Sequence, residues 1–147
     1  MMINYTKVLR KNLINVLKDI LKDVKKNGLI NSQHLYIAFK TNHHKVILPD
    51  WLKKKFPKEM SIVIQYEYWN LEIYKNSFDI ELSFNNKIAK LIIPFDSIIF
   101  FADPSTKFSL KLDIEKLEKK ENTKSIVATK EKKFKNNFIE FKSFKKY

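Results

Sequence analysis

Catalysis or metal binding would need histidine, cysteine, serine or carboxylate side chains in suitable positions, and this sequence offers few. Its histidines are His34, His43 and His44, and it has no cysteine. His43 and His44 are neighbours in an expected loop, where we expect the rings to point apart rather than to hold a metal ion together. We expect His34, which opens a strand, to bond to nearby backbone. No serine lies in a glycine-flanked nucleophile elbow, so the sequence predicts no enzyme activity, no metal site and no cofactor.

Phosphate-binding loops are also excluded. A P-loop or a dinucleotide fingerprint needs several glycines where the backbone approaches phosphate, and the chain has one glycine, Gly28. No apolar run reaches the ~18–20 residues that cross a membrane. Residues 1–10 do not form a secretion signal, and the absence of cysteine removes disulfides. We therefore expect one soluble, cytoplasmic domain without a membrane partner.

The positive charge could indicate nucleic-acid binding. There are 29 Lys and Arg against 16 Asp and Glu, for a formal net charge of +13, but Arg10 is the one arginine. Proteins that read phosphates and bases favour arginine, because its planar guanidinium binds bidentately. The abundant residues Lys, Ile and Asn also have A/T-rich codons, so a mutational bias is the favoured source of the charge. A small β-barrel that binds single-stranded nucleic acid stays open as the alternative function.

The elements that must position any site begin with a helix over residues 4–26. Apolar residues recur there at spacings of three and four: Tyr5, Leu9, Leu13, Val16, Ile20 and Val24, widened by Val8, Ile14, Leu17 and Leu21. Asn27-Gly28 is a typical helix stop. Such a wide stripe either covers one side of a core or also serves a second surface, such as a dimer partner.

Residues 34–112 are expected to form short antiparallel strands. The clearest is Ser77–Phe84, where apolar and polar residues alternate, followed by an Asn85-Asn86 hairpin turn and a return strand over 87–93. Further strands or short apolar pieces are expected at 34–40, 46–48, 60–68, 95–101 and 107–112, and one or two helical turns at 49–56. The predicted fold class is α+β, mostly β: an N-terminal helix followed by a small antiparallel β-sandwich or partly open barrel.

After residue 112 the pattern changes. Residues 113–137 are rich in Lys, Glu, Asn and Thr, which predicts a charged flexible linker. Apolar residues return over 138–147, and the favoured interpretation is a short recognition motif on a tether. The alternative is a tail that folds back onto its own domain.

Three segments of the chain resemble a known family. They are HLYIAFKT over residues 34–41, MSIVIQYEYWNL over 60–71, and IPFDSIIFFADPS over 93–105 followed by Phe108 and Leu110. In this order and spacing they resemble the alphaproteobacterial branch of stringent starvation protein B (SspB), whose members are adaptors that hand ssrA-tagged proteins to the ClpXP protease. The resemblance covers roughly residues 5–112 and extends to the tail, where residues 139–146 are similar to the family's ClpX-docking peptide.

The resemblance implies the fold and the partners. It implies a homodimer that forms through the N-terminal helix, for which the candidate interface residues are Leu9, Leu13, Leu17 and Ile20. It also implies that the tail docks on ClpX, through Ile139, Phe141, Phe144, Lys145 and Lys146. Two features depart from the family: residues 42–45 replace a loop that usually contains glycine, and Lys142 stands where an acidic residue is usual. The domains expected are thus 1–112 for tag binding and dimerisation, 113–137 as linker and 138–147 as docking peptide.

The resemblance further implies a groove that holds an extended tag peptide without bond chemistry. Gln65 is the best candidate there, because its amide both donates and accepts, as a peptide bond requires. We expect it on the face of the 60–68 strand opposite Ile62 and Ile64. The weaker candidates for the groove are Lys40, Thr41, Val46 and Tyr68, and we expect Trp69 in the core.

Overall fold

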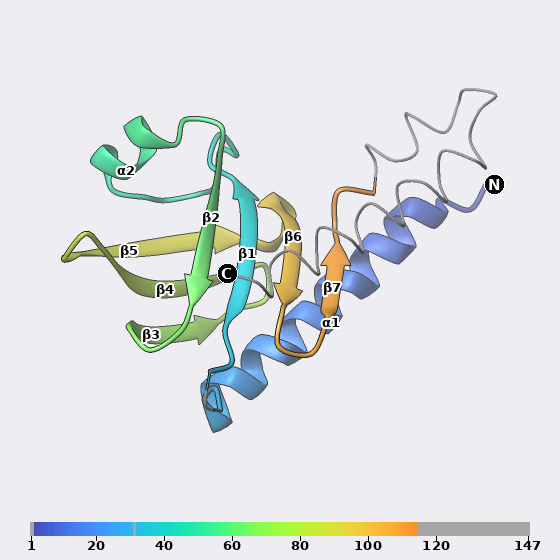
Figure 1. The fold of residues 1–147 in the computed structure, drawn as a ribbon. Helices are drawn as coiled ribbons and strands as arrows, with labels where there is room; N and C mark the ends of the chain where they lie inside the picture. The colour runs from blue at the N-terminus through green and yellow to red at the C-terminus, as the bar shows by residue number, and fades with distance from the viewer. Residues whose placement is uncertain (1, 31, 115–147) are drawn as a thin grey trace.

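The computed structural model of the chain describes residues 2–30 and 32–114. It confirms the predicted fold class: an N-terminal helix is followed by antiparallel sheets that do not close into a barrel (Figure 1). In chain order the elements are α1 (Tyr5–Asn27), β1 (Leu35–Lys40), α2 (Asp50–Lys55), β2 (Glu59–Ile64), β3 (Tyr68–Ile73), β4 (Ser77–Phe84), β5 (Lys87–Pro94), the 3-10 turn η1 (Phe95–Ser97), β6 (Ile98–Asp103) and β7 (Phe108–Lys111). The predicted linker and docking peptide lie outside the described residues, apart from Asp113 and Ile114. No helix in the described part of the chain is long and apolar enough to span a membrane.

Helix α1 has clear local causes at both ends. The Asn4 side chain accepts a hydrogen bond from the Lys7 backbone N–H at 3.0 Å and so satisfies a free donor of the first turn. Gly28 ends the helix with φ 73°, where a side chain would be strained, and its N–H donates to the Val24 carbonyl at 2.8 Å.

The apolar arc of α1 is divided between two surfaces. Leu17 and Leu21 are wholly buried, and Val24 is buried with them. Tyr5, Leu9 and Val16 lie on the adjacent face and are 73%, 51% and 40% exposed. The helix therefore covers one side of the core with half of its arc, and the other half, within the described chain, faces outward.

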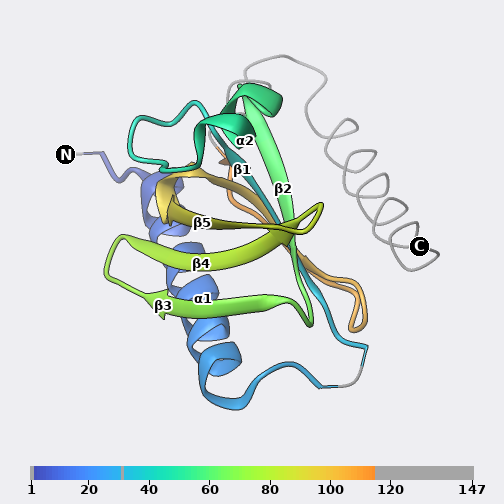
Figure 2. The same ribbon diagram turned by 90° about the vertical axis from the view of Figure 1, so that its left-hand side faces the viewer.

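The strands form two sheets that cross steeply (Figures 1 and 2). One sheet has the order β2-β1-β6-β7 and the other has the order β3-β4-β5, and all pairs are antiparallel. The β4–β5 hairpin turns at Asn85 and Asn86, both with positive φ, as predicted. Apolar residues from both sheets and from α1 form one core, whose largest fully buried side chains include Phe39, Phe78 and Phe101.

One expected strand is wrong: residues 60–68 do not run straight. Strand β2 ends at Ile64, because Tyr66 adopts φ 55° and turns the chain into β3, which was not predicted. As a result Gln65 lies in the turn after β2 rather than on its face. Trp69, expected in the core, is on the outer side of β3 and is 42% exposed.

Arg10 fastens the last strand to the helix. Its guanidinium donates to the carbonyl oxygen of Leu112 and, at 2.7 Å, to that of Asp96. Leu112 is fully buried, and its N–H donates to the Ile99 carbonyl at 2.8 Å. The place where the chain leaves the domain is therefore held by both backbone and side-chain bonds.

Candidate functional site

The outer edge of β2 is the best candidate for a binding site. Among the described strands β2 pairs only with β1, so half of its backbone N–H and C=O groups point away from the sheet. Both edges of the other sheet are more occupied. The edge of β5 forms a bridge in which Ile47 and Ile92 exchange two hydrogen bonds of 3.0 Å, and β3 lies near α1 through the Lys25–Glu72 ion pair. We call the outer edge of β2 with its two ends the β2 edge.

The β2 edge exposes both polar and apolar side chains. Ser61 is exposed and accepts a hydrogen bond from the Tyr36 hydroxyl at 2.7 Å. Val63, two residues further on, is 48% exposed. An extended peptide could therefore bond to the strand's backbone and rest apolar side chains beside Val63.

Gln65 and Tyr68 lie at one end of the β2 edge. The Nε2 of Gln65 donates to the carbonyl oxygen of Ser32 at 3.2 Å, which ties this end to the segment before β1. Within the described residues, no hydrogen bond reaches the Gln65 amide oxygen. Tyr66, next to it, is 75% exposed. This end can therefore offer an amide and an aromatic ring to a ligand.

Lys40, Thr41 and Val46 lie at the opposite end, because Lys40 pairs with Glu59 at the start of β2. Thr41 is fully buried, and its hydroxyl donates to the Phe56 carbonyl at 2.6 Å. Val46 is 7% exposed and belongs to the core. The fold thus already uses the side chains of Thr41 and Val46, and only Lys40 of this group remains at the surface. The predicted residues are spread over roughly 20 Å, the length of six extended residues.

The Nδ1 of His34 lies 3.3 Å from the Ser32 carbonyl oxygen, the contact with nearby backbone that was expected, whereas His43 and His44 differ from the expectation. The rings of His43 and His44 do not point apart but stack, with centroids 4.7 Å apart and planes inclined by 18°. Burial and the neighbouring charge of His44 lower the pKa of His43 below its usual 6.5. The Nδ1 of His43 accepts the Lys45 backbone N–H at 3.1 Å, which an uncharged ring allows. In the described part of the chain, no three His, Asp or Glu side chains gather where they could hold a metal ion.

The predicted dimer residues differ in how accessible they are. Leu9 is 51% exposed, and Leu13 and Ile20 are partly buried. Leu17 is fully buried in the core of its own chain, so its side chain is not available to a partner. We call the outward set Tyr5, Leu9, Leu13, Val16 and Ile20 the α1 stripe.

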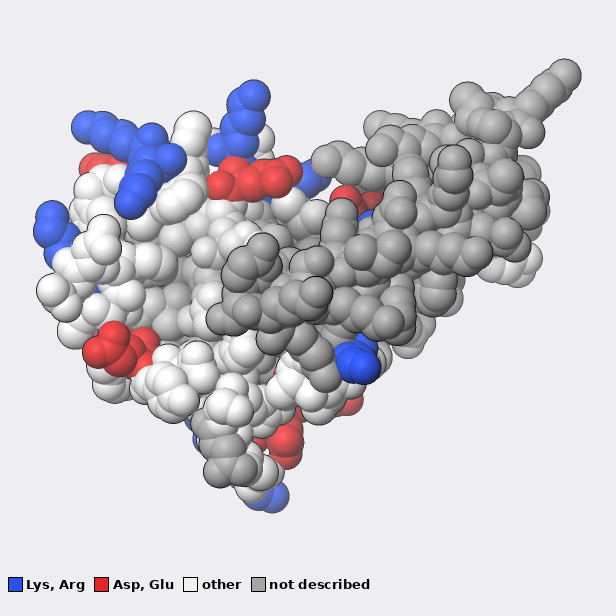
Figure 3. Space-filling view, viewed as in Figure 1, with Lys and Arg blue, Asp and Glu red and all other residues white. Residues whose placement is uncertain are grey.

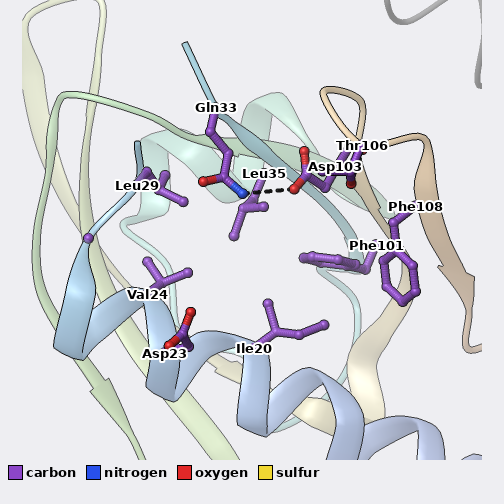
Figure 4. A pocket seen from close by; sticks show the side chains of 11 residues that line it. Ile20, Asp23, Val24, Leu29, Gln33, Leu35, Phe101, Asp103, Thr106 and Phe108 are labelled. Carbon is purple, nitrogen blue, oxygen red and sulfur yellow. Dashed lines mark hydrogen bonds between the residues drawn. The ribbon is translucent and has the colours of Figure 1, made fainter. Parts of the chain in front are cut away.

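A cavity of about 370 Å³ lies between α1 and the β6–β7 turn (Figure 4). Ile20, Phe101 and Phe108 give it an apolar wall, and a 2.9 Å hydrogen bond from Gln33 to Asp103 crosses its rim. The sequence did not suggest Gln33 or Asp103, whose contact joins residues 70 positions apart. None of the predicted tag-binding residues lines this cavity, whereas Ile20 of the α1 stripe does.

Comparison with known proteins identifies one family. The sequence model of the family described as stringent starvation protein B matches residues 7–143, nearly the whole chain. No curated protein matches the chain significantly.

Proposed function

The chain belongs to the stringent starvation protein B family of adaptors for the ClpXP protease, and on this premise we propose that it binds ssrA-type degradation tags and tethers the tagged proteins to ClpX. The observation that carries the proposal is the family match over residues 7–143, which spans the folded domain and most of the tail. The role requires no bond chemistry, because the adaptor acts by binding two partners at once.

The tag lies along the β2 edge in this proposal. A peptide of about six extended residues matches the length of β2, and its backbone can pair with the outward N–H and C=O groups of the strand. Gln65 then meets one end of the peptide with its amide. Lys40 lies near the other end, with Tyr68 beside Gln65.

The tail supplies delivery. Residues 138–147 dock on ClpX, with Phe141 and Phe144 as apolar anchors beside Lys145 and Lys146. A flexible linker over 113–137 spans roughly 25–30 Å. Two modest contacts become strong together, because the second is effectively intramolecular.

The α1 stripe forms the dimer in this proposal. Its exposed members, Tyr5, Leu9 and Val16, form an apolar surface on a 23-residue helix. A two-fold axis across the stripe would bury it against a second copy. Each dimer would then carry two tails.

Two titrations test the proposal against nucleic-acid binding. We expect the affinity for an ssrA-type peptide to depend weakly on salt concentration. A single-stranded oligonucleotide should either not bind or bind with an affinity that falls steeply as salt is added. Arg10 supports this expectation, because its guanidinium is engaged with two backbone carbonyls and is not presented to a ligand. Tight oligonucleotide binding without peptide binding would overturn the proposal.

A further inference from the structure

Helix α2 and the end of the β4–β5 hairpin form an aromatic and basic corner beside the start of β2. The Trp51 ring meets Phe84 edge-on, with centroids 6.4 Å apart, and the Lys87 ammonium lies 5.4 Å from the Trp51 ring centroid. Trp51 stays 39% exposed. Lys53, Lys54 and Lys55 are exposed on the same short helix. We call Trp51, Lys53, Lys54, Lys55, Phe84 and Lys87 the α2 corner.

The corner is a fixed part of the fold. Leu52 anchors α2 in the core at 1% exposure, and the Phe56 N–H donates to the Leu52 carbonyl at 2.9 Å. The Phe56 carbonyl in turn accepts the buried Thr41 hydroxyl. Trp51 and the lysines are therefore held at one end of the β2 edge without need of a ligand.

Charge differs sharply between the two ends of the β2 edge. Residues 53–58, which lead into β2, contain four lysines. Lys40 pairs with Glu59 at the start of β2, and Lys45 lies in the loop that follows Lys40. Only Asp50 and Glu59 oppose them in residues 50–59. Residues 60–74, which include the Gln65 end, contain no lysine or arginine and carry Glu67 and Glu72. Figure 3 shows lysine side chains gathered over the α2 end of the molecule.

We propose that the α2 corner binds acidic residues at one end of the peptide held by the β2 edge, and so fixes the direction in which that peptide lies. The proposal rests on the proposed function, since it needs a peptide on β2. The lysines attract carboxylates, and the exposed face of Trp51 can cover an apolar part of the same segment. The Gln65 end, which has no basic residue, then takes the neutral part of the peptide.

A peptide fits this surface better than a nucleic acid does. A nucleic acid carries a negative charge on every residue, so a strand along β2 would place phosphates near Glu67, in the turn that follows β2. An acidic segment at one end of a peptide meets only the lysines. The asymmetry of the surface therefore favours a ligand whose charge is also asymmetric.

The test uses the full chain and an ssrA-type tag peptide in three forms. Two glutamates are added before its first residue, or two after its last residue, or two glutamines at each end. We expect glutamates at one end only to tighten binding, by about tenfold at low salt, as several exposed charge pairs allow. Replacing Lys53, Lys54 and Lys55 by Gln should remove that gain, whereas replacing the exposed α1 lysines Lys11, Lys22 and Lys26 by Gln, with the same loss of charge, should preserve it.

Tryptophan emission provides a readout that does not depend on removing lysines. In a Trp69→Phe protein, Trp51 is the single tryptophan, and its emission should shift more with the favoured glutamate peptide than with the glutamine peptide. Equal tightening at both ends, or none at either, would overturn the inference while leaving tag binding intact. Failure of every peptide to bind would instead refute the proposed function. A third outcome would assign the corner to nucleic acid. In it, glutamates at neither end of the peptide improve binding, whereas an oligonucleotide competes with the peptide for the parent protein and not for the variant that lacks Lys53, Lys54 and Lys55.

Discussion

Gln65 is the residue whose position argues most directly for a ligand. It follows the outer strand, and its amide already bonds to the Ser32 carbonyl at 3.2 Å through Nε2. The same side chain can therefore order the turn and present its amide oxygen to a peptide N–H. When one partner of such a hydrogen bond is removed, binding weakens, because the other partner is left unsatisfied in the complex.

We expect Gln65→Ala to weaken binding of an ssrA-type peptide by about 1–3 kcal/mol. Fluorescence anisotropy with a labelled peptide measures this directly. Asn12→Ala is the matched control, since it removes a side-chain hydrogen bond of 2.8 Å to the Val8 carbonyl on α1, away from Gln65 and Ser32. Both variants should lose a similar, small amount of stability, and only the Gln65 variant should lose affinity. Equal affinity of Gln65→Ala and the parent protein would exclude Gln65 from the site.

His43 should make the stability of the domain sensitive to acid. Its pKa is lowered by burial and by His44, so the folded state holds this proton less readily than the unfolded state does. The stability contributed by the neutral ring is therefore present above the usual pKa of 6.5 and is lost as pH falls below it toward the folded pKa. When the pH is lowered from about 7.5 to about 5.5, the midpoint urea concentration of unfolding should fall less for His43→Gln than for the parent chain. An NMR titration that places the His43 pKa at or above its usual value would contradict this.

At the scale of elements, α1 carries an apolar surface that its own domain does not cover. Leu9 and Val16 lie on the α1 stripe, whereas Leu17 is inside the core. The difference matters for experiment, because a charge at Leu17 would unfold the domain and report nothing about assembly. Leu9 and Val16 are the positions at which assembly can be tested separately from folding.

We expect Leu9→Asp combined with Val16→Asp to give a folded monomer, because the two carboxylates of each helix would be buried against the two of its partner across the dimer axis. Sedimentation velocity measures the mass and circular dichroism the fold. Asn15→Asp adds a charge on another, exposed face of the helix and should leave the dimer intact. A parent chain that sediments as a monomer at micromolar concentration would refute the dimer itself.

Much of the fold could be predicted from local patterns. The C-terminal end of α1 followed from Asn27-Gly28, and β4 and its hairpin followed from strict alternation and two asparagines. The turn at Tyr66 could not be predicted, because the segment 60–69 is rich in isoleucine, valine and aromatic strand formers and has no glycine or proline to mark the turn. The same limit hid β3 and misplaced Trp69.

The candidate site was only partly predictable. The position of Gln65 near an exposed edge depends on which strands pair, and that pairing joins residues far apart in sequence. The buried roles of Thr41 and Val46 follow from contacts with Phe56 and with the core, which no local pattern announces. The basic α2 corner was visible as a run of lysines, but its aromatic partner Phe84 comes from a distant hairpin.

For the whole molecule, we expect binding and delivery to separate cleanly. A chain ending at Ile114 keeps the complete described core, and it keeps an amide carbonyl at Leu112 for Arg10. It should fold, dimerise and bind tag peptide with full affinity, yet fail to speed ClpXP degradation of a tagged substrate, because the second contact is no longer tethered. The measurement is the degradation rate at sub-saturating substrate. Equal stimulation by the two chains would refute the tether.

Within the tail, Phe144 is the residue expected to matter most. Phe144→Ala should reproduce most of the loss of ClpXP stimulation that truncation causes. It should weaken ClpX binding by about 2 kcal/mol if the ring fills a pocket. Lys142→Asp should change ClpX binding and leave tag binding alone. Tag affinity measured in parallel is the control for both variants. A Phe144→Ala chain that stimulates ClpXP fully would move the anchor elsewhere in residues 138–147.

The bonds of Arg10 have a mechanical consequence. If the tail docks on ClpX as proposed, an unfoldase that pulls on the cargo also loads the tail, and that force enters the described domain at Leu112. Because Arg10 ties the Leu112 carbonyl to α1 and to Asp96, the load passes into the helix instead of peeling the four-residue β7 from β6. We expect Arg10→Ala to lower the force at which β7 detaches when optical tweezers pull on the tail. Lys11→Ala, the control, should leave that force unchanged. Equal forces for Arg10→Ala and the parent chain would mean that the load takes another route. Resistance at this point would let the adaptor leave each round of delivery still folded.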